Sequence, residues 1–268
     1  MMQLEFAQKA KEIFSKNENV IGLAVGGSWL SNQMDEFSDL DLIVVTVEKI
    51  TDGKTLMMQY AKSLGNFLSG FTGEHVGEPR VLICLYDNPL LHVDLKFVTT
   101  EEFHVRVETP HILFDRDGQL KRSLDNSEAK FPFPGYQWIE DRFWTWIHYA
   151  LLKLGRGEYL EAYDFLGFLR MVVFGPLLHI KNEKLPRGVR KAEMDLIPKD
   201  FESLISTVSN YEKASILISL KNGVELYRQL RTSLYNNAVD INQTAEQKVM
   251  EYFEYIEKRQ HNDITNLD

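Results

Sequence analysis

The feature that most constrains this chain is a glycine turn followed, ten residues later, by two aspartates at the head of a strand-like run. Gly26 and Gly27 precede Ser28, and Asp39 and Asp41 stand one residue apart just before the apolar sequence Leu-Ile-Val-Val. Such a β-branched run is typical of a buried strand. Because alternate residues of a strand share one face, both aspartates are predicted to project together, with the residue between them facing the core.

Two carboxylates held this close are unfavourable unless a proton or a cation lies between them. Mg²⁺ suits such oxygen ligands, and its coordination is commonly completed by substrate phosphates. Gly26 and Gly27 would allow a phosphate to approach the backbone closely, and Ser28 offers a hydroxyl and a backbone N–H. The residues therefore predict a site for phosphate and metal.

A further aspartate lies in a second strand-like segment, residues 92–98. Apolar side chains alternate there with Asp94 and Lys96, which would share the opposite face. A bare buried carboxylate is costly, so Asp94 must be solvated, paired or metal-bound. We consider it the candidate third ligand; the alternative is a strand aspartate that faces solvent.

Gly27-Ser28, ten residues, then Asp39-Leu40-Asp41 resembles the signature of nucleotidyltransferases of the DNA polymerase β-like superfamily. The aminoglycoside, lincosamide and minimal nucleotidyltransferases are the most similar groups. The resemblance implies a small mixed sheet with helices, two Mg²⁺ ions, and transfer of a nucleoside monophosphate from a triphosphate to an acceptor hydroxyl. It also implies a third carboxylate on a later strand, which completes the metal site and takes the acceptor proton. Asp94 is the candidate for that role.

The length of 268 residues predicts two domains, since single domains usually have about 100–200 residues. We expect an α/β (α+β) nucleotidyltransferase domain over residues 1–125 and a helical bundle over residues 135–268, which would bind the acceptor. A polar, proline-containing linker is predicted over residues 119–134. The hydrophobic content of 44% is sufficient for a core in each domain.

The order of elements follows from hydrophobic periodicity and turn residues. In the first domain we predict a helix from residue 4 that ends near 17–19, a strand at 20–25, a short helix from 28 to about 32, a strand at 40–47, a helix at 54–68, a loop at 70–79, a hairpin of strands 80–86 and 91–98, a capped helix at 99–103 and a strand at 111–118. In the second domain we predict helices at 137–155, 158–181, 199–208, 211–236 and 244–259.

The helix predicted at 137–155 carries a stripe of aromatic and basic side chains. Arg142 and Lys153 on this stripe are candidate contacts to the triphosphate, although basic side chains that extend past core aromatics to water would give the same pattern. The next helix begins with Glu158, Glu161 and Asp164. Acids in a first turn commonly complement the helix dipole, and they would also suit the ammonium groups of an aminoglycoside.

Charge and composition limit the partners. The net charge of −9 argues against a general nucleic-acid binder and is compatible with a cationic acceptor, although solubility alone would also explain it. Cys84 is the only cysteine, no apolar run approaches the roughly 20 residues of a membrane span, and the start does not resemble a signal peptide. These features predict a cytoplasmic protein that does not interact with membranes.

Three functions are therefore considered. The first is a nucleotidyltransferase that moves AMP, with ATP as the default donor, to a small molecule such as an aminoglycoside or lincosamide. The second is a nucleotidyltransferase that acts on a protein or RNA. The third is a non-catalytic nucleotide-binding module, for which loss of a metal carboxylate would be expected; all three aspartates are present. The sequence does not contain the P-loop motif of a classical kinase.

Overall fold

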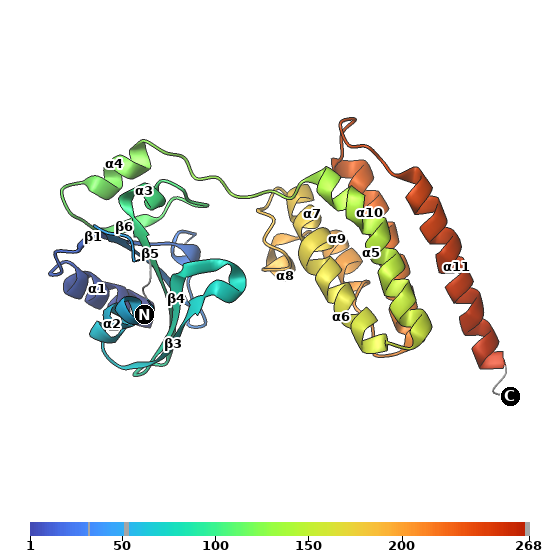
Figure 1. The fold of residues 1–268 in the computed structure, drawn as a ribbon, viewed down its shortest axis with the longest axis horizontal. Helices are drawn as coiled ribbons and strands as arrows, with labels where there is room; N and C mark the ends of the chain where they lie inside the picture. Colours follow the sequence, from blue (N-terminus) through green and yellow to red (C-terminus); the bar gives the residue numbers. More distant parts are fainter. Residues whose placement is uncertain (32, 51–53, 266–268) are drawn as a thin grey trace. The chain divides into compact units, whose positions relative to one another are not determined.

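The computed structural model describes residues 1–31, 33–50 and 54–265, and the chain divides into two compact units, Met1–Phe131 and Pro132–Asp268. The first unit is a mixed α/β structure and the second is helical (Figure 1), as the sequence predicts.

A six-stranded mixed sheet forms the first unit, in the order β3-β4-β5-β2-β1-β6. β2 and β5 are parallel, and every other neighbouring pair is antiparallel. The parallel pair lies in the middle of the sheet, where both edges of each strand are hydrogen-bonded. The strands are β1 (Val20–Val25), β2 (Leu40–Thr46), β3 (Phe67–Gly73), β4 (Glu78–Tyr86), β5 (Leu91–Thr99) and β6 (His111–Asp115).

Helices cover the two faces of this sheet unequally. α1 (Met2–Phe14) and α2 (Lys54–Ser63) lie on one face and bury the larger core, which includes Leu42 of β2 and Leu95 of β5. The short helices α3 (Thr100–Phe103) and α4 (Gln119–Asp125) cover a smaller core on the other side (Figure 1). This second face is therefore the side on which polar strand residues can remain partly open.

Several predicted elements are confirmed with small changes at their ends. The strand at 20–25, the antiparallel hairpin of β4 and β5, and the capped helix after β5 are present. Thr99 accepts a hydrogen bond from the Glu102 N–H, while the Glu102 side chain accepts one from the Thr99 N–H. The short helix predicted from residue 28 is a 3₁₀ turn, Gly27–Trp29, and its predicted end at residue 32 lies outside the described residues.

Two predictions around residues 64–79 are wrong. The helix predicted at 54–68 ends at Ser63, and the segment predicted as a loop at 70–79 contains most of β3, a 3₁₀ turn and the start of β4. Gly65 and Asn66 adopt positive φ angles of 77° and 52°, which end the helix and redirect the chain. The apolar residues that follow belong to an outer strand of the sheet, although their spacing imitates a helix.

The predicted linker at 119–134 is also partly wrong, because it begins with α4. Asp115, at the end of β6, accepts hydrogen bonds from the N–H groups of Leu120 and Lys121, each at 3.0 Å, and so caps the start of this helix. Leu120 and Leu124 then pack against the smaller core. The cap lies within the preceding strand, so the polar composition of the segment did not reveal it.

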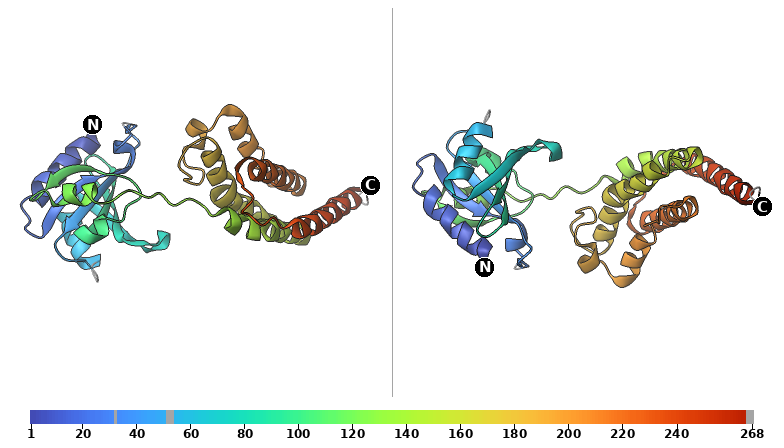
Figure 2. Two further views of the ribbon diagram at one scale, coloured as in Figure 1. Left: turned by 90° about the horizontal axis from the view of Figure 1, so that it is seen from above. Right: turned by 90° about the horizontal axis from the view of Figure 1, so that it is seen from below.

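In the second unit, α11 packs along α5 and α10 packs against α5 and α6 (Figure 2). A π-helical stretch, Arg170–Phe174, interrupts the helix predicted at 158–181 and separates α6 from α7. The helices are α5 (Tyr136–Arg156), α6 (Tyr159–Leu169), α7 (Gly175–Lys181), α8 (Ala192–Asp195), α9 (Pro198–Ile205), α10 (Lys213–Leu234) and α11 (Gln243–Thr265).

One stretch of this unit, Tyr159–Lys181, is long and apolar enough to cross a membrane if only length and composition are considered. Half of its most apolar window is buried inside the structure. Its buried side chains belong to the core that α5 and α10 share. We therefore assign Tyr159–Lys181 to the core of the helical unit.

Candidate active site

The structure brings Asp41 and Asp94 together on the central parallel pair of strands. They are register partners in β2 and β5, and neither belongs to the apolar core under α1 and α2 that buries Leu40 and Val93. Both aspartates are half-buried on the less covered face of the sheet. The predicted alternation in both strands is therefore confirmed.

Asp39 lies just before β2 and is also half-buried. Burial raises the pKa of Asp94, and the negative charge of Asp39 raises it further, while His92 acts in the opposite direction. The His92 Nε2 atom lies 2.9 Å from Asp94 Oδ1, from the same face of the same strand. His92 was not predicted as a site residue, although its spacing of two from Asp94 was visible in the sequence.

The glycine turn lies directly beside Asp41. Gly27 has a φ of +64°, and the Asp41 carboxylate occupies the place where a side chain at position 27 would begin. Gly26 donates its N–H to the Asp41 carbonyl oxygen at 3.0 Å, which fixes the turn against the start of β2. Only glycine fits position 27, and Ser28 follows it in the 3₁₀ turn.

A fourth carboxylate reaches the same turn from the loop before β6. Glu108 Oε1 accepts a hydrogen bond of 2.7 Å from the Gly27 N–H. Sequence reasoning missed Glu108, because it lies 81 residues from Gly27 in a segment without a motif. Only the tertiary structure brings the two residues together.

The carboxylate oxygens of Asp39, Asp41 and Asp94 are suited to Mg²⁺, which prefers oxygen ligands. Among the described residues, no three His, Cys, Asp or Glu side chains are already arranged as a metal-binding group. Mg²⁺ typically binds through one or two carboxylates and keeps water and phosphate as its other ligands. Asp41 and Asp94 are register partners, and the charge of Asp39 acts on Asp94. They could therefore supply the one or two carboxylates that Mg²⁺ needs.

A cavity of about 790 Å³ in the same unit is lined by charged side chains, among them Lys96, which shares the strand and face of Asp94. Lys96 and Arg80 both pair with Glu78, at 2.9 and 2.6 Å. The hydrogen bond from Arg80 outweighs burial and, with Lys96, lowers the pKa of Glu78 to about 2. Glu78 therefore offsets part of the positive charge beside this cavity.

Arg142 and Lys153 lie on α5 in the helical unit. Arg142 donates to the Trp138 carbonyl oxygen at 2.9 Å and lies over the Trp138 ring. Lys153 pairs with Glu158 at 2.7 Å and Glu161 at 3.0 Å, and these hydrogen bonds raise its pKa. Both side chains thus have partners within their own unit, and their predicted contact to nucleotide is not tested by these contacts.

The acids at the start of the next helix surround a cavity of about 430 Å³. Glu158, Glu161 and Asp164 line it together with Tyr159 and Tyr211. Carboxylates and aromatic rings in one hollow are compatible with a cationic ligand.

Comparison with known proteins gives a family for the first unit. Residues 7–114 match the family model described as a nucleotidyltransferase domain, and this range contains Gly27, Ser28, Asp39, Asp41 and Asp94. No curated protein sequence matches the chain.

Three solved structures are similar at low identity. They are an aminoglycoside 6-adenyltransferase from Bacillus subtilis (18% identity, covering 93% of this chain and 97% of that chain, TM-score 0.38), a nucleotidyltransferase-like protein from Exiguobacterium sibiricum 255-15 (16%, 85% and 76%, TM-score 0.37), and a spectinomycin adenyltransferase from Enterococcus faecialis with ATP and spectinomycin (14%, 95% and 99%, TM-score 0.31).

The family match covers the sheet from α1 to β6, with the glycine turn and all three aspartates at its centre. The predicted resemblance and enzyme class are confirmed by it. Residues 7–114 therefore form a nucleotidyltransferase domain, in agreement with the resemblance to the DNA polymerase β-like superfamily, and this domain supports a nucleotidyltransferase activity.

Proposed function

We propose that the chain transfers a nucleoside monophosphate, with ATP as the first donor to test, to a hydroxyl group of a small cationic molecule such as an aminoglycoside. The observation that carries this proposal is the register pairing of Asp41 with Asp94 beside the glycine turn. Two half-buried carboxylates on one sheet face, next to a backbone that admits no side chain, suit a phosphate with its cation.

Asp39, Asp41 and Asp94 are the residues that would hold Mg²⁺, as two ions by the family resemblance. When bound, these ions neutralise the triphosphate and activate the acceptor hydroxyl. The backbone N–H groups at Gly27 and Ser28 would bind phosphate oxygens and stabilise their developing charge. Asp94 would accept the hydroxyl proton, which is the role that the family resemblance gives to the third carboxylate. The hydroxyl oxygen bonds to the α-phosphorus, and pyrophosphate leaves.

We assign residues 1–125 to nucleotide binding and residues 135–268 to acceptor binding. The cavity with Glu158, Glu161 and Asp164 supports a cationic acceptor, since Glu158 and Glu161 already bind one cation, the Lys153 ammonium, and Asp164 lines the same cavity. Lys153 would have to leave Glu158 and Glu161 to contact a triphosphate, so we expect a smaller role for it than for the aspartates. The cytoplasm is the proposed location, because Cys84 is the single cysteine.

The experiment that tests this function is Mg²⁺-dependent pyrophosphate release from each of the four nucleoside triphosphates. It is run with and without a panel of aminoglycosides and lincosamides, and with Asp39→Asn/Asp41→Asn as the control variant. Acceptor-dependent release that the variant lacks would support the proposal and identify the donor. Nucleotide binding without pyrophosphate release would indicate that the acceptor is a protein, an RNA or another molecule outside the panel. Absence of nucleotide binding would contradict the proposal.

A further inference from the structure

Glu108 contacts the glycine turn in a way that the proposed chemistry does not use. Its Oε1 atom accepts the Gly27 N–H at 2.7 Å, and the same atom would lie 2.7 Å from a Cβ built at Gly26. The Asp41 carboxylate lies where a Cβ atom at Gly27 would be. The Glu108 carboxylate thus already accepts the Gly27 N–H, which the proposed function assigns to a phosphate oxygen.

The loop that carries Glu108 is anchored on both sides. Arg106, two residues earlier, donates to the carbonyl oxygens of Ser127 and Leu124, and its own carbonyl oxygen accepts the Lys130 N–H at 2.8 Å. Pro110, two residues later, is buried. The position of Glu108 is therefore set by the fold of the first unit, and its carboxylate is held at the turn.

We propose that Glu108 is an internal competitor of the nucleotide phosphate and sets the affinity of the site. One N–H can serve one strong acceptor at a time, and a carboxylate is a strong, charged acceptor for it. A triphosphate must therefore displace Glu108 from Gly27, and return of Glu108 after transfer favours release of pyrophosphate. This inference rests on the proposed function, because it assigns the Gly27 N–H to a phosphate.

The test is calorimetric measurement of binding to the full chain with Mg²⁺ present. The probes are an ATP analogue with a methylene group between the α and β phosphorus atoms, tripolyphosphate, and adenosine. Glu108→Ala frees the N–H and removes a negative charge, so we expect its Kd for the analogue and for tripolyphosphate to fall about tenfold. Glu108→Gln keeps an acceptor but loses the charge, and we expect a smaller decrease.

Two controls separate this effect from a general change in structure. Adenosine does not carry a phosphate, so its affinity should be equal in wild type and Glu108→Ala. Glu101→Ala removes the same charge from an exposed position on α3 and should leave all three affinities unchanged. If Glu108→Ala fails to fold, Glu108→Gln still has to bind tripolyphosphate more tightly than wild type.

Analogue and tripolyphosphate binding that is unchanged or weakened in both Glu108 variants, while wild type binds normally, would overturn the role of Glu108 alone. If wild type itself does not bind the analogue, or if Asp39→Asn/Asp41→Asn binds it equally well, the proposed function fails and this inference fails with it. Tighter binding of both phosphate probes, with adenosine unaffected, is the result that we expect.

Discussion

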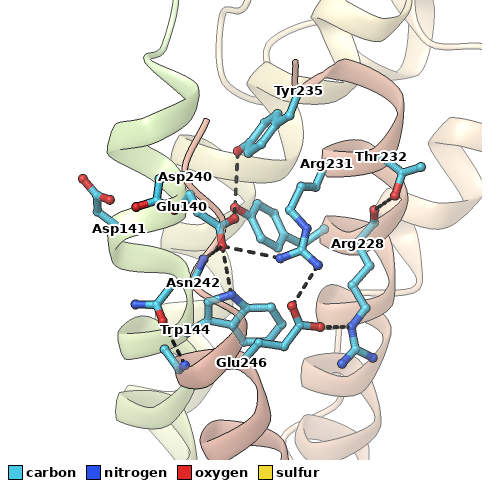
Figure 3. Close-up of polar contacts among 12 residues, drawn as sticks. Glu140, Asp141, Trp144, Arg228, Arg231, Thr232, Tyr235, Asp240, Asn242 and Glu246 are labelled. Atoms are coloured by element: carbon cyan, nitrogen blue, oxygen red, sulfur yellow. Dashed lines mark hydrogen bonds and ion pairs between the residues drawn. The ribbon is translucent and has the colours of Figure 1, made fainter. Parts of the chain in front are cut away.

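Two kinds of carboxylate can be compared in this chain: the buried one of Glu140 in the helical unit, and the half-buried ones in the sheet. Their polar surroundings are opposite in character. Glu140 is 1% exposed, and it accepts hydrogen bonds from Tyr227 at 2.5 Å, the Asn242 N–H at 3.2 Å, and Arg231 and Trp144 at 3.4 Å each (Figure 3). Arg231 is in turn paired with Glu246 at 2.8 Å. These partners of Glu140 come from α5, α10 and the loop between α10 and α11.

Asp94 is surrounded differently. Its carboxylate contacts His92, burial raises its pKa, and Asp39 adds a like charge. Fixed donors around a carboxylate stabilise the fold, whereas carboxylates placed close together repel each other and favour a bound cation. Glu140 and Asp94 thus differ in the number of hydrogen-bonding partners around them, and Asp94 is one of the acids that we propose as metal ligands.

The largest effect that this contrast predicts is on activity. Asp39→Asn/Asp41→Asn removes two proposed metal ligands, and we expect pyrophosphate release to fall at least about a thousandfold, because the bound ions supply several kcal/mol of transition-state stabilisation. The free energy of unfolding, measured without Mg²⁺, should stay equal or rise, since a like-charge repulsion is relieved. A loss of activity that merely follows a loss of folded protein would contradict the assignment.

Glu140→Ala should show the reverse pattern. It leaves Arg231 and Tyr227 without their buried partner, and removal of one member of such a pair costs about 3–5 kcal/mol of unfolding free energy. Denaturant unfolding followed by circular dichroism measures this loss. Glu251→Ala, at an exposed position on α11, is the matched control and should change stability by less than about 0.5 kcal/mol. Equal effects of the two substitutions would show that the contacts of Glu140 with Tyr227 and Arg231 do not stabilise the packing of the helices.

A smaller effect on stability is expected from Gly27→Ala. The positive φ costs about 1–2 kcal/mol for alanine, and its methyl group would also meet the Asp41 carboxylate. Gly77→Ala is a matched control, since Gly77 has a φ of 77° with no atom within 4 Å of the added carbon. Nucleotide binding should be lost in Gly27→Ala and kept in Gly77→Ala. If both variants bind nucleotide equally, the close approach at Gly27 is unimportant for the site.

The smallest effect concerns Glu78, a half-buried acid that, unlike Asp94, has two cationic partners. Its pKa is lowered to about 2, so its ion pairs stabilise the fold above the unfolded value of 4.5 and lose this effect as the pH falls toward 2. We expect Glu78→Gln to cost about 1 kcal/mol at pH 6, because the group is partly exposed. Unfolding curves at pH 6, 4 and 3 should converge for the two proteins, and a difference independent of pH would contradict this explanation.

The sequence predicts the strands that carry the candidate site well, because the signals for them are local. Strand alternation predicts that Asp39 shares a face with Asp41 and that Asp94 shares one with Lys96, while only the parallel pairing of β2 with β5 brings Asp41 and Asp94 into register. The contacts of Glu108 and Glu140 could not be predicted, since Gly27 lies 81 residues from Glu108, and Tyr227, Arg231 and Asn242 lie 87–102 residues from Glu140. Such contacts depend on how loops and helices pack, and hydrophobic periodicity does not describe that packing.

The errors in the fold have the same origin. Residues 64–68 have helical spacing, yet the left-handed conformations at Gly65 and Asn66 end the helix there. The α4 helix was taken for a linker because its cap, Asp115, belongs to the previous strand. In both places, local composition was outweighed by a backbone turn or by a contact from another element.

The most direct test of the central claim is the number of Mn²⁺ ions that the chain binds together with the methylene ATP analogue, measured by electron paramagnetic resonance. Mn²⁺ replaces Mg²⁺ at oxygen ligands and can be counted. We predict two ions for each chain in wild type, fewer in Asp94→Asn, and no bound complex in Asp39→Asn/Asp41→Asn. The same stoichiometry in all three proteins would contradict the claim that these aspartates form the metal site.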